Sequence, residues 1–389
     1  MSKKKTVNHI SRAIDNKVER VLWARAAGRC EFDDCNEIIY RSSVTQEPVN
    51  AAEMAHIYSF SEDGPRGWRG FWGGSKDLNT AENLILVCRK CHKLIDEDKE
   101  GLRYSAELLR KWKLQHEDRV EMVTGIKPSK RSHVLLYGGK IGEEHSPLDP
   151  ALAMTAMFPN WNPAESRAID LTLKCEHEDK SPEFWRTEEA HLRARFEREV
   201  RPRIEEAKPN HFSVFARADQ PLLILLGALL TDKVPATVYQ LHREPSPNWK
   251  WKEHPGGFQF IVNRPTKKGI QPVLAFSLSG KITPDRVSKA VGDDVAIWEV
   301  TVPECSNRIL QSEAQLSMFR DQVCKLIAEI NEAYPKAQYI SVFPAMPVSC
   351  AVELGRLRMP RADIPWMIYD QNHKLGGFVP ALTIGEPKR

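Results

Sequence analysis

Four cysteines in two closely spaced pairs constrain the fold of the first third of this 389-residue chain. Four residues separate Cys30 from Cys35, and two residues separate Cys88 from Cys91. Two short loops that each present two sulfur atoms to one point are typical of a tetrahedral four-cysteine zinc site. We therefore expect these residues to bind a structural Zn²⁺ on which local folding depends. The alternatives are packing cysteines or a redox role for one pair.

The composition indicates a folded protein outside the membrane. The chain is 41% hydrophobic and 28% charged, which is typical of globular proteins, and its length predicts more than one domain. The longest apolar run, residues 221–230, is too short to cross a bilayer, and the basic N-terminus lacks the apolar segment of a secretory signal. We expect a cytoplasmic location with reduced thiols and no membrane partner.

The chain divides by pattern into two domains. A helix is expected from about residue 106 to residue 123, because Ser105 can cap it and Leu108, Leu109, Trp112 and Val120 share one face. This helix closes a first domain over residues 1–123. Residues 124–133 have the composition of a linker, and residues 134–389 form the second domain.

The second domain contains an internal repeat. Ser213-Val214-Phe215 recurs 128 positions later as Ser341-Val342-Phe343, and Gly227 recurs as Gly355 at the same spacing. Around these matches the order strand, long helix, strand, helix, strand is expected twice, over about residues 165–245 and 293–372. Such alternation predicts an α/β fold with two Rossmann-like halves and parallel sheets. Chance similarity of two α/β segments is the alternative.

Three side chains with catalytic potential lie within the cysteine frame. His56 lies between the two cysteine pairs, Asn83 precedes Cys88, and His92 directly follows Cys91. This order of His, Asn and Cys-x-x-Cys-His resembles the HNH endonucleases from about residue 28 to residue 118. The resemblance implies a zinc-stabilised α+β domain with a ββα-metal fold that hydrolyses DNA phosphodiester bonds.

Phosphodiester hydrolysis needs a base that takes a proton from water near pH 7, which a neutral imidazole can do. We assign this role to His56. The resemblance implies that His92 binds a catalytic divalent cation, Mg²⁺ or another, and that Asn83 positions the loop or orients the base. Many HNH enzymes have a metal ligand directly before the first His, where this chain has Ala55. Asp96 shares a helix face with His92 and is our candidate ligand; a solvated carboxylate is the alternative.

The second domain has no motif of its own for catalysis, so it is interpreted as a ligand-binding or assembly module. Residues 273–281, 341–349 and 369–371 resemble the SAVED domain, which consists of two fused CARF-like halves and recognises cyclic oligonucleotides. An anionic ligand would be held by basic side chains and helix N-termini. The candidate ligand-binding residues are Arg217, Lys281, Arg308 and Ser349.

An HNH nuclease joined to a SAVED domain resembles the effectors of CBASS anti-phage defence. The resemblance implies that a cyclic di- or trinucleotide drives assembly into a homo-oligomer, a dimer or a tetramer, which degrades double-stranded DNA without sequence specificity. One alternative is a non-catalytic zinc-finger regulator that binds nucleic acid and senses a ligand. Another is a stand-alone restriction enzyme that acts on modified DNA.

Overall fold

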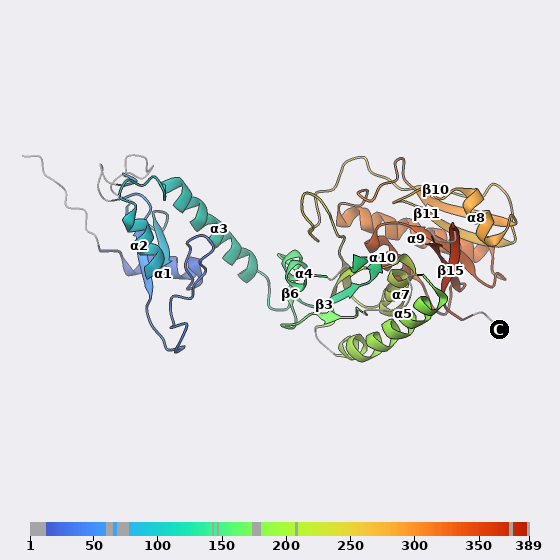
Figure 1. Ribbon diagram of the computed structural model, residues 1–389, viewed down its shortest axis with the longest axis horizontal. Helices are drawn as coiled ribbons and strands as arrows, with labels where there is room; N and C mark the ends of the chain where they lie inside the picture. The colour runs from blue at the N-terminus through green and yellow to red at the C-terminus, as the bar shows by residue number, and fades with distance from the viewer. Residues whose placement is uncertain are drawn as a thin grey trace, which may run out of the picture. The chain divides into compact units, whose positions relative to one another are not determined.

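The computed structural model describes residues 13–59, 65–67, 78–141, 144–145, 148–172, 180–206, 209–372 and 376–386. The chain forms two compact units, Met1–Lys127 and Pro128–Arg389 (Figure 1). The first strand of the second unit begins at Arg131, so it includes the last three residues of the segment 124–133 that was expected to be a linker. Each unit is described by itself below.

The first unit is built around a β-hairpin and the helix that follows it. The elements are α1 (Asn16–Ala26), β1 (Ala52–His56), β2 (Leu84–Cys88), α2 (Arg89–Glu97) and α3 (Ala106–Thr124). β1 and β2 pair antiparallel, with Ala52 opposite Cys88 and His56 opposite Leu84. Every residue of β2 is buried, and α2 begins directly after it. This order of two strands and a helix places His56 at the end of β1 and His92 in the first turns of α2.

Helix α3 has the start that the sequence predicts. The Ser105 hydroxyl accepts a hydrogen bond from the backbone nitrogen of Leu108 at 3.2 Å, as expected of an N-cap. Leu109 is fully buried on the face that packs against α1 and β2. α3 therefore holds the hairpin and the first helix in one core.

The second unit contains two larger sheets and the helices that cover them. Its strands are β3 (Arg131–Gly138), β4 (Lys140–Ile141), β5 (Glu144–His145), β6 (Asn162–Pro163), β7 (Ile169–Asp170), β8 (Phe212–Arg217), β9 (Ala236–Val238), β10 (Ile261–Asn263), β11 (Gln271–Ser277), β12 (Val295–Thr301), β13 (Ile340–Ala345), β14 (Trp366–Asn372) and β15 (Gly377–Ile384). Its helices are α4 (Pro150–Met157), α5 (Pro182–Arg195), a π-helical turn (Phe196–Val200), α6 (Arg201–Glu205), α7 (Gln220–Leu230), α8 (Pro284–Val291), α9 (Glu313–Ala333) and α10 (Val348–Leu357).

The two sheets share a central order of strands. In the first, β3 lies between β7 and β8, and β9 pairs with β8; all three pairings are parallel. In the second, β11 lies between β12 and β13, and β14 pairs with β13, again all in parallel. The central strands β3 and β11 lie outside the ranges 165–245 and 293–372 in which the repeat was expected.

The second sheet is mixed, so the prediction of purely parallel sheets was wrong. Its order is β10-β12-β11-β13-β14-β15, and both outer strands are antiparallel to their neighbours. β15 follows β14 after only a few residues, and so short a connection can join only antiparallel strands. Within the part of the chain that the structure describes, no helix has both the length and the apolar character needed to cross a membrane.

Two helices meet backbone to backbone between the sheets. α7 is apolar on all sides and almost wholly buried, and it packs against α10 in the core that both sheets share. A Cβ atom at Gly227 would lie 1.9 Å from the carbonyl oxygen of Val352, and one at Gly355 would lie 1.9 Å from that of Ile224. The two contacts are related by the same spacing of 128 positions that relates the sequence matches.

An aromatic pair is also present once in each sheet. The ring of Phe215 in β8 stacks on Tyr239 with centroids 4.4 Å apart, and the ring of Phe343 in β13 stacks on Tyr369 with centroids 4.6 Å apart. Phe215 and Phe343 are again 128 positions apart. Each of these two phenylalanines therefore stacks on a tyrosine, although Tyr239 and Tyr369 are 130 positions apart.

Candidate functional site

The four cysteines of the first unit converge on one point. Cys30 and Cys35 lie after α1, Cys88 ends β2, and Cys91 lies in α2; all four Sγ atoms are within 4.8 Å of one another. In a tetrahedral site with Zn–S bonds of about 2.3 Å, the sulfur atoms are about 3.8 Å apart. The Sγ atoms of Cys35 and Cys88 are 3.9 Å apart. The cluster thus fits a zinc ion.

Burial also affects the protonation of this cluster. Burial raises the pKa of the Cys30 thiol to about 12, and burial likewise raises the pKa of Cys91. Without a cation these thiols stay protonated at neutral pH. A bound zinc ion would stabilise the thiolate form.

His56 is held by an asparagine that the sequence analysis did not single out. Its Nε2 lies 3.0 Å from Oδ1 of Asn79, whose Nδ2 donates to the carbonyl oxygen of Ala13 at 3.3 Å. Because the amide oxygen accepts, Nε2 carries the proton, and the lone pair of the neutral ring is at Nδ1. The contact with Asn79 therefore favours the tautomer of His56 with its proton at Nε2.

Asn83 is fully buried and clamps the chain that follows β1. Its Oδ1 accepts from the backbone nitrogen of Tyr58 at 2.8 Å. Its Nδ2 donates to the carbonyl oxygens of Tyr58 and Leu78 at 3.0 and 2.9 Å. These bonds fix the backbone two residues from His56.

His92 and Asp96 form a pair on α2, as their spacing suggested. The Nδ1 atom of His92 lies 3.0 Å from Oδ2 of Asp96. A carboxylate at Nδ1 orients the ring and keeps Nε2 on the opposite side of it, an arrangement that is common in metal-binding histidines. In this geometry Asp96 orients the ring of His92.

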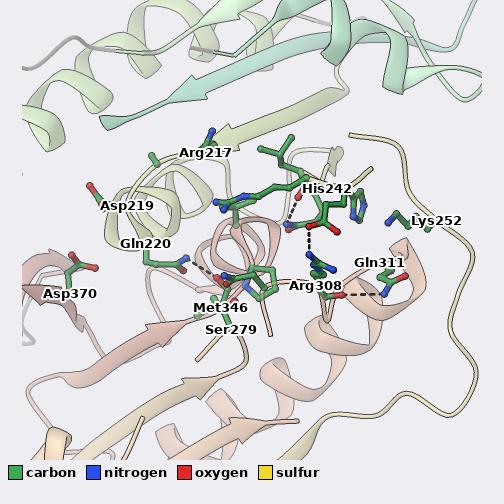
Figure 2. A pocket seen from close by; sticks show the side chains of 18 of the residues that line it. Arg217, Asp219, Gln220, His242, Lys252, Ser279, Arg308, Gln311, Met346 and Asp370 are labelled. Atoms are coloured by element: carbon green, nitrogen blue, oxygen red, sulfur yellow. Dashed lines mark hydrogen bonds and ion pairs between the residues drawn. The ribbon is translucent and has the colours of Figure 1, made fainter. Parts of the chain in front are cut away.

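The second unit contains a cavity of about 660 Å³. Arg217 at the end of β8, Ser279 after β11, Met346 after β13 and Asp370 in β14 all line it (Figure 2). The cavity thus lies beyond the carboxyl ends of parallel strands from both sheets, which is where open α/β sheets bind ligands.

Among the residues that the structure describes, the lining carries more positive than negative charge. Its basic side chains are Lys180, Arg217, Arg243, Lys252 and Arg308, and its acidic ones are Asp219, Glu244 and Asp370. Arg308 is ion-paired with Glu244. An excess of two positive charges in a concave polar site is suited to an anionic ligand.

The four residues expected to bind the ligand separate into two groups. Arg217 and Arg308 line the cavity, whereas Lys281 and Ser349 lie outside its lining. The Ser349 hydroxyl is buried and donates to Oε1 of Gln240 at 2.8 Å, and Gln240 does line the cavity. Ser349 therefore positions a lining residue.

Lys180, which no sequence motif indicated, bridges the two sheets at one end of the cavity. Its Nζ lies 2.6 Å from Oδ2 of Asp370 and 3.7 Å from Oδ1 of Asp219, and it donates to the carbonyl oxygen of Gln371 at 3.0 Å. Asp219 follows β8 of the first sheet, and Asp370 belongs to β14 of the second. Lys180 thus forms ion pairs with an aspartate from each sheet.

Two buried polar atoms of the lining have no hydrogen-bond partner among the residues that the structure describes. They are Oε1 of Gln220 and Nε2 of His242. Burial lowers the pKa of His242, so its ring is neutral at pH 7. Unpaired polar groups are costly inside a protein.

Comparison with known proteins gives two family matches. Residues 30–99 match the HNH endonuclease family. Residues 192–384 match the SAVED family, whose full name is "SMODS-associated and fused to various effectors sensor domain". No curated protein matches the chain.

Similar solved structures are receptors that contain SAVED/CARF domains. The Acinetobacter baumannii Cap4 receptor with the cyclic trinucleotide 2'3'3'-cAAA is 11% identical, has a TM-score of 0.42, and aligns over 76% of this chain and 59% of its own. The Moraxella osloensis Cap4 receptor is 11% identical, has a TM-score of 0.36, and aligns over 76% of this chain and 60% of its own. The chain therefore spans about three fifths of the length of these receptors.

Proposed function

Because this chain joins an HNH endonuclease domain to a SAVED sensor domain, we propose that it is an effector nuclease of cyclic-oligonucleotide-based anti-phage signalling (CBASS). A cyclic di- or trinucleotide bound by the second unit would drive oligomerisation and switch on degradation of double-stranded DNA by the first. The observation that carries the sensor role is the 660 Å³ cavity with its excess of basic side chains.

The sensor is proposed to consist of two fused, CARF-like halves. Support comes from the shared strand order of the two sheets, with the same parallel pairings. The reciprocal contacts of Gly227 and Gly355 provide independent support, because a shared fold does not by itself require the same backbone atoms to touch. The cavity lies where the strands of both halves end, so each half contributes to one ligand site.

The nuclease step is assigned to His56. Its Nδ1 takes a proton from a water molecule, whose oxygen attacks the phosphorus; the bond from phosphorus to the 3′ oxygen breaks, and the leaving oxygen takes a proton from solvent. The bond between His56 and Asn79 orients the ring for this transfer. Asn83 holds the neighbouring backbone in place.

The His92–Asp96 pair fits a catalytic divalent cation. Histidine with a carboxylate at its second nitrogen is a common metal-binding pair, and Nε2 of His92 would be the ligand. Such a cation, when bound, withdraws charge from the scissile phosphate. Ala55 leaves the position before His56 without a ligand, and Asp96 remains the candidate for a second protein ligand.

Plasmid cleavage with a panel of cyclic di- and trinucleotides tests the proposal. With Mg²⁺, one compound should switch on degradation by the wild-type protein. His56→Ala should abolish cleavage and leave ligand affinity unchanged, whereas the control His254→Ala, an exposed histidine outside the cavity lining, should cut normally. Cleavage that persists in His56→Ala would exclude the assigned base. Zinc binding and DNA binding without cleavage in any lane would favour the non-catalytic regulator.

A further inference from the structure

A short loop after β9 carries Glu244 at the cavity. The loop consists of residues 243–247 and is closed at its base by two hydrogen bonds. The backbone nitrogens of His242 and Asn248 donate to each other's carbonyl oxygens at 2.8 and 2.9 Å. The next residue, Trp249, is buried and packs against β8 of the first sheet. The base of the loop is therefore anchored to the first sheet.

The carboxylate of Glu244 is ion-paired with a residue on the other side of the cavity. Its partner is Arg308, which lies between β12 of the second sheet and α9. Both side chains line the cavity, and a dashed line in Figure 2 marks the pair at Arg308. A carboxylate of the protein thus occupies the guanidinium group that is a candidate for binding an anionic ligand.

Other contacts hold the two backbones that carry this ion pair. The backbone nitrogen of Lys252, after the loop, donates to the carbonyl oxygen of Gln311 at 2.9 Å. The backbone nitrogen of Arg308 donates to the hydroxyl of Ser306 at 3.2 Å. Neither bond involves the carboxylate of Glu244. The ion pair can therefore open by side-chain rotation alone, with the backbone on both sides still fixed.

The pair is exposed enough for a ligand to replace it. The side chains of Arg308 and Glu244 are 71% and 61% exposed. An exposed ion pair contributes little free energy, because water solvates both charges once the pair opens. Arginine binds the oxygens of a phosphate with the same planar fork of N–H donors that binds a carboxylate. Glu244 and a phosphate group would therefore compete for Arg308.

We propose that Glu244 is an internal competitor, which holds Arg308 in the absence of activator and is displaced by a phosphate of the cyclic oligonucleotide. This inference rests on the proposed function of the second unit and adds a regulatory contact to it. Because an exposed pair contributes little, the competition weakens activator binding by up to about fivefold. Glu244 thus raises the activator concentration at which the sensor responds.

Removal of the Glu244 charge tests the proposal on the full chain. Calorimetry at physiological salt would measure the affinity for the tightest-binding member of a panel of cyclic di- and trinucleotides. Glu244→Gln keeps the shape of the side chain and should bind this compound about threefold to fivefold more tightly than wild type. The matched control Glu253→Gln removes an exposed charge outside the lining and should keep the wild-type affinity. Unchanged or weaker binding by Glu244→Gln would overturn the inference.

A second background separates competition for Arg308 from a general effect of charge. In Arg308→Met the carboxylate has no guanidinium to occupy, and charges that do not touch are largely screened at this salt concentration. Adding Glu244→Gln to Arg308→Met should therefore leave the affinity unchanged. The same gain in both backgrounds would refute the competition while leaving the proposed function intact. No binding of any cyclic compound by the wild-type protein would overturn both.

Discussion

The contact between α7 and α10 gives a sharp prediction about stability. In Gly227→Ala, the new Cβ atom would lie 1.9 Å from the carbonyl oxygen of Val352, and in Gly355→Ala it would lie 1.9 Å from that of Ile224. An ordinary contact of this kind needs about 3.4 Å, so the helices must separate locally by about 1.5 Å. Overpacking of a core costs about 1–3 kcal/mol, and a clash with backbone belongs at the upper end.

The assay is thermal unfolding of the full chain, followed in the second unit by circular dichroism or calorimetry. A loss of about 3 kcal/mol predicts a fall in Tm of about 6–12 °C for a unit of this size. The control is Gly256→Ala, because a Cβ atom there meets nothing within 4 Å and the backbone has an ordinary conformation. That variant should keep the wild-type Tm.

The double variant makes the reasoning more specific. Both substitutions act on one helix crossing, so the separation forced by the first makes room for the second. Gly227→Ala with Gly355→Ala should therefore cost clearly less free energy of unfolding than the two single changes together. Strict additivity, or single variants as stable as Gly256→Ala, would refute the backbone contact.

Three further predictions concern metal, pH and ligand. Elemental analysis should find one zinc ion per wild-type chain. The variant Cys35→Ser should lose the zinc ion, and its first unit should unfold. A wild-type protein that is folded but free of zinc would contradict the four-thiolate site. Burial raises the pKa of Glu188 from the ordinary 4.5 to about 7. Between these pH values the folded state binds a proton that the unfolded chain has lost, so the stability of the fold decreases as the pH rises from 4.5 through 7. Glu188→Gln should remove this slope, measured as Tm at pH 5 and pH 8, and should be up to about 3 kcal/mol more stable than wild type at pH 8. Arg217→Met should weaken binding of the activating cyclic nucleotide about tenfold, whereas Lys281→Met, outside the lining, should not; equal losses would count against this cavity.

Local patterns predicted much of the first unit. The spacing of Cys88 and Cys91 at the start of α2 brings two sulfur atoms together through a few backbone dihedrals. The cap at Ser105 and the pairing of His92 with Asp96 likewise involve residues three or four positions apart. Asn79 shows the limit, because its contact with His56 depends on how the intervening loop folds back.

The sequence by itself determined the four cysteines that cluster in the first unit, the order of His56, Asn83 and His92, and the spacing of 128 that relates matching residues of the second unit. These features follow from short spacings or from repetition, so no knowledge of distant contacts is needed. Only the tertiary structure decided the ligand cavity. Lys180 meets Asp370, and Gln220 meets Met346, across more than a hundred residues of chain. Strand pairing and the α7–α10 contact bring these groups together, and they also bury Ser349 beneath Gln240 rather than in the lining.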